Sequence, residues 1–170
     1  MTIDCEGCLV RSWEPGDAPS MARHAHSREV WLSLRDAFPH PYALADAEAY
    51  LAFLRTQPQE TSFAIDVAGE AAGGIGLTLG EDVARCSAEI GYWLGQKFWG
   101  RGIMTAAVRA TTDYAFDRFR LTRVFALPFV RNAASYRVLE KAGYEREGLL
   151  RRSAIKDGVV LDQYLYSKVS

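Results

Sequence analysis

The stretch that decides the fold is "QKFWGRGIMTAAVRA", residues 96–110, in which Gly100 and Gly102 flank Arg101. It follows an aromatic, strand-like segment and precedes a helix-like one. The first turn of a helix has free backbone N–H groups and a partial positive charge. Glycines let the chain turn sharply and let a ligand approach the backbone. The stretch therefore predicts a phosphate-binding loop, with a plain strand-to-helix turn as the alternative that this signal leaves open.

Two familiar phosphate loops do not fit this stretch. A Walker A loop requires Gly-Lys-Ser/Thr, whereas Ile103 and Met104 follow Gly102 here. The dinucleotide fingerprint requires three glycines near the start of a βαβ unit, whereas this loop has two and lies past the middle of the chain. The expected ligand bears phosphate but is not bound in the manner of ATP or NAD.

The segments around the loop alternate between strand and helix patterns. We expect a strand over 86–95, a helix over Ile103–Phe119, a strand over 122–130 and a helix over Asn132–Ala142 that stops at Gly143. Two final strands, around 144–153 and 159–169, are joined by the turn "KDG". The apolar face of the first helix is expected to be buried; it comprises Met104, Val108, Thr111, Ala115 and Phe119.

The N-terminal half predicts one strand, two helices and a hairpin. The strand is Leu9–Trp13, the helices cover 28–38 and 43–57, and the hairpin pairs Ser62–Val67 with Ala72–Leu79. The order β-α-α-β-β-β-α-β-α-β-β indicates an α/β or α+β fold around a single sheet.

Composition limits the class of protein. The chain has 170 residues, 49% of them hydrophobic and 24% charged, with a net charge of -1. We expect one domain over residues 1–170, no attraction to nucleic acid and no membrane span. The N-terminus has no secretion-signal pattern and the cysteine count is odd, so we expect a cytoplasmic protein with reduced thiols. A zinc site at Cys5 and Cys8, with His24 and His26 nearby, is the alternative to free thiols; no second pair has finger spacing, and we expect no metal.

Two motifs together resemble a known family. "AEIGYWLGQKFWGRGIMTAA" and "RNAASYRVLEKAGYEREG" are similar to the GNAT superfamily of N-acetyltransferases, and within it to the RimJ/RimL-type ribosomal-protein N-terminal acetyltransferases. Lys97 stands where the family's loop has Arg or Gln. The second motif matches at Asn132, Ser135, Leu139, Glu140, Lys141, Gly143 and Tyr144.

This resemblance implies a fold and a co-substrate. The fold is a mixed, mostly antiparallel sheet of about seven strands, splayed at its centre, with about four helices on its two faces. The co-substrate is acetyl-CoA, with its pyrophosphate on backbone N–H groups from about Phe98 to Thr105 and its pantetheine arm between the splayed strands. The implied contacts are Tyr92, Trp93, Leu94, Lys97, Phe98, Trp99, Gly100, Arg101, Gly102, Ile103, Met104, Thr105, Asn132, Ser135 and Arg137.

The chemistry requires a base for the attacking amine and help for the departing thiolate. Glu89, on the strand before the loop, is the candidate base; a solvent-facing strand glutamate is the alternative. Asn132 is expected to cap its helix, and Ser135, one turn further on, is the candidate donor to the thiolate, as proposed for RimL-type enzymes. Many members of the superfamily use a Tyr seven residues after the Asn, where this chain has Leu139. Backbone N–H groups from Tyr92 to Leu94 are candidate oxyanion donors.

The acceptor is expected to be a primary amine. Freeing a protein α-amine of its proton at pH 7 costs about 1 kcal/mol, against about 4.6 kcal/mol for a lysine, so one modest carboxylate suits the α-amine better. Small-molecule amines remain open. Candidate acceptor-binding residues, which are equally compatible with a core role, are Trp31, Phe38, His40 and Tyr42. The alternative function is a catalytically silent acyl-CoA-binding or sensing module, and either a monomer or a homodimer is compatible with the sequence.

Overall fold

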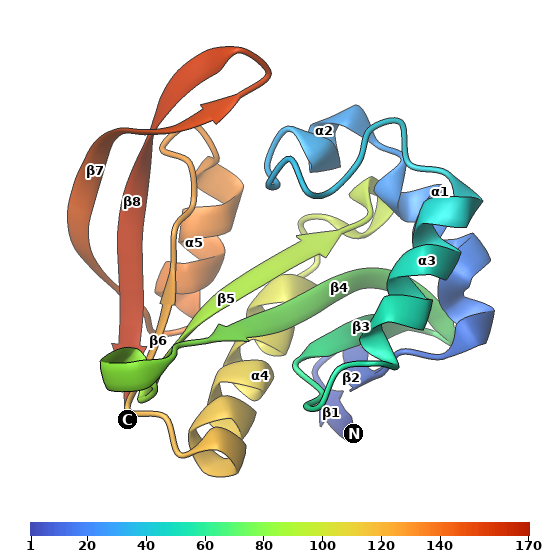
Figure 1. Cartoon of the computed structure of the whole chain (residues 1–170), viewed down its shortest axis with the longest axis horizontal. Coiled ribbons are helices and arrows are strands. Elements are labelled where there is room, and N and C mark those ends of the chain that lie inside the picture. The colour runs from blue at the N-terminus through green and yellow to red at the C-terminus, as the bar shows by residue number, and fades with distance from the viewer.

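A computed structural model describes residues 1–170 as one twisted sheet with helices on both faces (Figure 1). The strands are β1 (Thr2–Cys5), β2 (Cys8–Ser12), β3 (Ser62–Val67), β4 (Glu70–Leu79), β5 (Ser87–Leu94), β6 (Arg123–Ala126), β7 (Glu145–Lys156) and β8 (Val159–Val169). The helices are α1 (Ala18–Ala25), α2 (Arg28–Trp31), α3 (Leu44–Leu54), α4 (Ile103–Phe119) and α5 (Ala133–Lys141).

The sheet runs in the order β1-β2-β3-β4-β5-β6-β8-β7. Every neighbouring pair is antiparallel except β5 and β6. That parallel pairing is short, covering only Ser87–Glu89 against Arg123–Phe125. Beyond Glu89 the two strands diverge, so the sheet opens at its centre as the resemblance implied (Figure 1).

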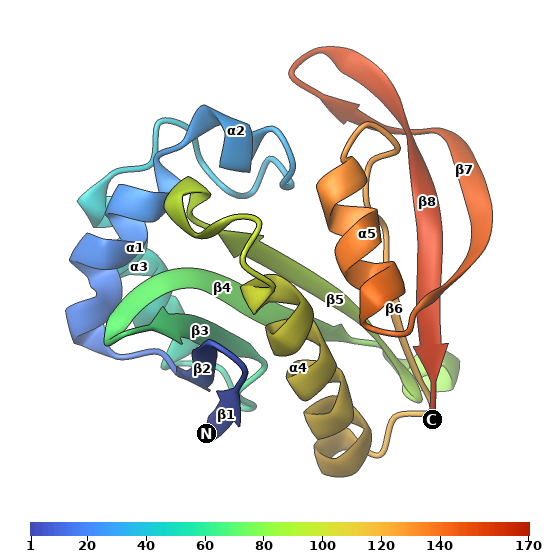
Figure 2. The same ribbon diagram turned by 180° about the vertical axis from the view of Figure 1, so that it is seen from behind.

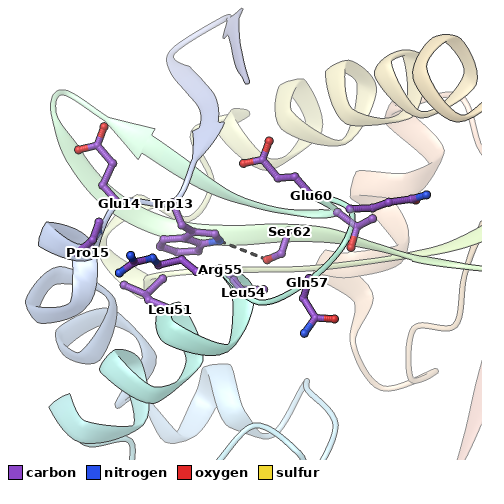
Figure 3. Close-up of a pocket in the computed structure, with 11 residues that line it drawn as sticks. Trp13, Glu14, Pro15, Leu51, Leu54, Arg55, Gln57, Glu60 and Ser62 are labelled. Carbon is purple, nitrogen blue, oxygen red and sulfur yellow. Dashed lines mark hydrogen bonds between the residues drawn. The ribbon is translucent and has the colours of Figure 1, made fainter.

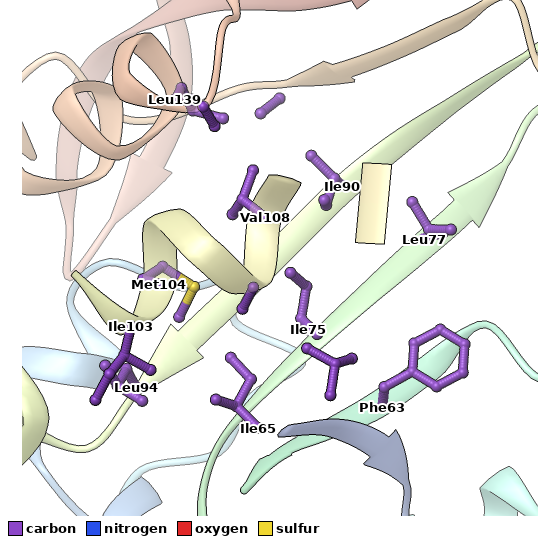
Figure 4. Packing of buried hydrophobic residues seen from close by; sticks show 14 of the residues in the cluster. Phe63, Ile65, Ile75, Leu77, Ile90, Leu94, Ile103, Met104, Val108 and Leu139 are labelled. Carbon is purple, nitrogen blue, oxygen red and sulfur yellow. The ribbon is translucent and has the colours of Figure 1, made fainter. Parts of the chain in front are cut away.

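The main core lies between the sheet and helices α4 and α5, which lie in front of the sheet in Figure 2. Side chains of the central strands meet the buried face of α4 and one residue of α5, Leu139 (Figure 4). Met104, Val108, Thr111 and Ala115 of α4 are buried, as the 3.6-residue period predicted, whereas Phe119 is only partly buried. A smaller core on the other face is made by Ala18, Met21, Ala25, Tyr42, Ala47 and Leu51.

The C-terminal half has the predicted order of elements, although β6 covers only Arg123–Ala126 of the strand expected over 122–130. Helix α4 has the expected bounds, Asn132 caps α5, and Gly143 has the left-handed φ of 90° expected of a helix stop. The β7–β8 turn is made by Asp157 and Gly158, which both have positive φ.

The N-terminal half differs from the prediction in three places. A strand, β1, precedes the expected first strand, because Gly7 at φ 81° folds Thr2–Cys5 back onto β2, which is Cys8–Ser12 rather than Leu9–Trp13. Helix α1 lies in and beyond what was interpreted as the turn "PGDAPS". The helix expected over 28–38 is only four residues long. After Trp31 the chain leaves the helix, and its next residues line the cleft described below. The sheet thus has eight strands rather than about seven.

Candidate active site

The loop before α4 presents a row of free backbone donors. Gly100 and Gly102 have φ of 74° and 79°, a left-handed conformation that glycine adopts without strain. The N–H groups of residues 100–105 donate to no acceptor in the chain. Those of Phe98 and Trp99 are already engaged, with the carbonyls of Gly95 and Gln96 at 3.0 and 3.1 Å. The free donors therefore begin at Gly100 rather than at Phe98.

Most side chains of this loop face elsewhere. Lys97 Nζ lies 2.9 Å from Glu70 Oε2, and Trp99 Nε1 donates to the carbonyl of Leu94 at 2.7 Å. Phe98, Ile103 and Met104 are buried in the core, while Thr105 is partly buried. Arg101 is exposed, with its guanidinium 5.8 Å from the centre of the Phe98 ring. An anion at this loop would therefore meet backbone N–H groups and Arg101.

The opening between β5 and α5 is lined by hydroxyl groups. Tyr92 Oη lies 3.0 Å from Ser135 Oγ and 3.2 Å from the carbonyl oxygen of Ser135. Burial raises the pKa of the Tyr92 phenol above its ordinary value, so the phenol stays neutral. Because β5 has no sheet partner on this side after Glu89, the backbone from Tyr92 to Leu94 faces the opening.

Helix α5 begins at this opening with its N-cap in place. Asn132 Oδ1 accepts a hydrogen bond from the Ser135 N–H at 3.2 Å, which fixes the first turn of α5 and with it the backbone position of Ser135. Arg137 is exposed on the same helix, and Leu139 is fully buried in the core.

Glu89 lies on β5 at the last position paired with β6 and has one strong partner. Its carboxylate Oε1 accepts from Arg35 Nη2 at 2.5 Å, and its side chain is 21% exposed. Arg35 belongs to the segment between α2 and α3, which was predicted to be helical. Sequence reasoning missed this contact, since the two residues are 54 positions apart and nothing in the local pattern joins them.

A cleft of about 940 Å³ is lined by residues of β4, β5 and α3 and of the segment between α2 and α3. Its lining includes Glu89, Tyr92, Trp93 and Ser135, together with parts of α3 and the tip of the β7–β8 hairpin. Of the acceptor candidates, Phe38 and Tyr42 line this cleft and pack on each other with ring centres 4.8 Å apart.

Trp31 and His40, the other two acceptor candidates, are not part of the cleft lining. Their rings stack on each other at 5.3 Å, and Lys156 Nζ lies 3.8 Å from the centre of the Trp31 ring. Lys156 also donates to Asp36 at 2.8 Å. These residues thus join the segment after α2 to the β7–β8 hairpin and close the cleft on that side.

A smaller pocket of about 190 Å³ adjoins the cleft, with which it shares Trp13, Leu54, Gln57, Thr61 and Ser62. Figure 3 shows Trp13 in this pocket with Ser62 as its hydrogen-bond partner, at 3.3 Å from the indole nitrogen. Sequence reasoning had placed Trp13 at the end of a strand without assigning it to a pocket.

The residues of the zinc alternative lie in different surroundings. Cys5 and Cys8 face each other across the β1–β2 turn. His24 Nε2 lies 2.7 Å from Glu70 Oε1, and His26 Nδ1 lies 3.0 Å from the carbonyl of Tyr42. No three His, Cys, Asp or Glu side chains converge in the structure. No helix combines the length and the apolar character that a bilayer crossing requires.

Known proteins share both sequence and fold with this chain. The family profile of the acetyltransferase (GNAT) domain matches residues 8–145. YjcK of Bacillus subtilis, which carries the name of a probable N-acetyltransferase, is 48% identical over 73 residues, 43% of this chain and 40% of that protein. The ribosomal-protein-serine acetyltransferase of Escherichia coli is 30% identical over 83 residues, 49% of this chain and 46% of its own. Each alignment thus spans less than half of the curated relative.

Among solved structures, RimJ of Mycobacterium smegmatis in complex with CoA-disulfide superposes with a TM-score of 0.85. The match has 25% sequence identity and covers 100% of this chain and 86% of that one. The likeness of fold therefore includes the N-terminal half, where α3 was predicted from the sequence but α1 was missed and the helix over 28–38 was predicted too long.

Proposed function

This chain belongs to the acetyltransferase (GNAT) family, and we propose that it transfers the acetyl group of acetyl-CoA to a primary amine. The acceptor is a protein N-terminal α-amine or a small-molecule amine. Two relatives support the reaction class: the ribosomal-protein-serine acetyltransferase of Escherichia coli by its name, and RimJ of Mycobacterium smegmatis by its complex with CoA-disulfide.

The row of unbonded N–H groups from Gly100 to Thr105 is the observation that carries this proposal. It lies at the start of a seventeen-residue helix, so the helix dipole adds to the attraction for an anion. A β-carbon placed on Gly100 or Gly102 would meet no atom within 4 Å, so the space over the loop is open. These features suit the pyrophosphate of coenzyme A, which needs backbone donors and close approach.

Acetyl-CoA supplies an acetyl thioester: the amine nitrogen bonds to the acetyl carbon, the carbon–sulfur bond breaks with its electron pair on sulfur, and the amine loses its surplus proton. Glu89 accepts that proton, directly or through water. Ser135 donates a hydrogen bond to the sulfur. Backbone N–H groups of the Tyr92–Leu94 stretch stabilise the negative charge that develops on the acetyl oxygen during the attack. The cleft holds the acceptor against Phe38 and Tyr42.

Arg35 adds a condition to this scheme. The Arg35 guanidinium forms an ion pair with the Glu89 carboxylate, and the Arg35 side chain is 69% exposed. A cationic amine entering the cleft competes with Arg35 for the same carboxylate. Because exposed ion pairs are weak, typically below about 1 kcal/mol, this contact yields to a bound acceptor.

A thiol-release assay separates this function from a catalytically silent acyl-CoA-binding module. The protein is mixed with acetyl-CoA and a panel of amines that includes peptides with free N-termini, and coenzyme A thiol is measured. We expect release with at least one amine and none with buffer alone. Binding of acetyl-CoA without release across the panel would support the silent module.

A further inference from the structure

Tyr92 and Ser135 form a hydroxyl pair that joins the two sides of the opened sheet. Tyr92 projects from β5, and Ser135 lies in the first turn of α5, 43 residues further along the chain. Their oxygens are 3.0 Å apart, and both residues line the cleft. No other side chain bonds to either hydroxyl, so each depends on the other residue for its orientation.

The direction of this hydrogen bond decides what Ser135 can do. A serine hydroxyl has a single proton. If Ser135 donates that proton to Tyr92, whose own proton then goes to the Ser135 carbonyl at 3.2 Å, none remains for a ligand. If Tyr92 donates to Ser135 Oγ, the serine proton is left for an acceptor in the cleft, and the first bond polarises the second.

Tyr92 acts as a hydrogen-bond donor and not as a source of protons. An ordinary phenol has a pKa of about 10, above the pKa of about 8.5 of a cysteine-type thiol. Burial raises the pKa of Tyr92 further, so passing its proton to a thiolate is uphill. A neutral phenol bonded to Ser135 Oγ can still stabilise negative charge on a nearby sulfur through the serine.

We infer that Tyr92 is a positioning residue that donates to Ser135 Oγ and thereby directs the serine proton to the sulfur of bound coenzyme A. The inference rests on the proposed function, since it requires coenzyme A in the opening between β5 and α5. Under this inference the tyrosine hydroxyl at the opening comes from strand β5. Position 139 of α5, where many members of the superfamily have a tyrosine, is a buried leucine in this chain.

Titration of the coenzyme A thiol in its complex with the protein tests this inference without relying on turnover. Thiolate formation is followed by ultraviolet absorbance, after subtraction of the coenzyme-free protein, for wild type, Tyr92→Phe, Ser135→Ala and the double variant. A hydrogen bond to a charged group is worth enough to shift a pKa by about one unit, a tenfold change in the dissociation constant. We expect the thiol pKa to be about one unit higher in each single variant than in wild type, and no higher in the double variant than in either single variant.

Tyr136→Phe is the matched control, because it removes a tyrosine hydroxyl next to Ser135 on the same helix. The Tyr136 ring packs on Tyr164 and Tyr166, and its hydroxyl has no hydrogen bond. It should leave the thiol pKa at the wild-type value. Calorimetry with coenzyme A accompanies each titration. Tight binding with an unchanged thiol pKa in Tyr92→Phe, or additive effects of the two substitutions, would overturn the inference alone. Failure of wild type to bind coenzyme A would overturn the proposed function and the inference with it.

Discussion

Glu89 and Arg35 show how a single contact changes the interpretation of a residue. On β5, Glu89 alternates with buried neighbours and has the pattern of any half-buried strand glutamate. The structure places its carboxylate in the cleft, bound to a guanidinium from the segment after α2. The position of Glu89 on its strand was predictable from the resemblance. Its partner was not, because Arg35 is 54 positions away in the sequence and meets Glu89 only in the folded chain.

Replacement of Glu89 by glutamine tests its role as the base. We expect Glu89→Gln to lower kcat by roughly 100-fold and to leave acetyl-CoA affinity nearly unchanged, because proton removal acts in the transition state. The loss should shrink as the pH rises and the amine deprotonates without help. The measurement is the pH–rate profile with a surrogate amine, with Glu81→Gln at an exposed turn as the control. A profile identical to that of wild type would remove Glu89 from the mechanism.

Among the helices and strands, predictability depended on how each segment is buried. Helix α4 was predicted to its ends because its buried face repeats over seventeen residues and a glycine loop precedes it. Helix α1 was missed, although Ala18, Met21 and Ala25 have helical spacing, because the proline and glycine before them indicated a turn. The helix expected over 28–38 was predicted too long. Phe38 was counted as part of an apolar helix face, but its ring packs on Tyr42 and Trp93 outside any helix.

The loop before α4 is tested by two valine substitutions at left-handed glycines. Gly102 and Gly158 have φ of 79° and 74°, and at both sites the position that a β-carbon would occupy has no atom within 4 Å. Valine should strain both sites similarly. We expect only Gly102→Val to weaken coenzyme A binding, by at least about tenfold or about 1.4 kcal/mol, because only that site lies in the proposed phosphate loop. Calorimetry on the two folded variants decides the matter; equal affinities would contradict the phosphate-loop assignment.

Across the whole fold, ion pairs join strands that are distant in sequence. Glu147 of β7 accepts from Arg123 of β6 at 2.6 and 2.5 Å and from Ser167 of β8 at 2.6 Å. The Arg123 bonds, followed by the Ser167 bond, lower the pKa of Glu147 to about 2. A carboxyl whose pKa is lower in the folded state stabilises the fold above its unfolded pKa and loses that effect as the pH falls toward its folded pKa.

The lowered pKa of Glu147 predicts how the stability of the fold changes in acid. We expect the urea midpoint of wild type to fall as the pH is lowered from about 5 to about 2, and to fall less steeply in Glu147→Gln. Salt should reduce the difference, since Glu147 is 39% exposed and the pair is screened. Parallel curves for the two proteins would show that Glu147 titrates alike in the folded and unfolded chains.

Acetyl transfer to a matched pair of peptides, which differ only in whether the α-amine is free or blocked, is the most direct test of the proposed activity. Each peptide, and in parallel a set of small amines, is incubated with acetyl-CoA and the protein, and thiol release is measured together with the mass of the acceptor. We predict thiol release and an added acetyl group on the free peptide and not on the blocked one, or on a small amine if peptides are not the acceptor. Thiol release that is the same for the free peptide, the blocked peptide, the small amines and buffer, with no acetylated amine, would contradict the proposed activity.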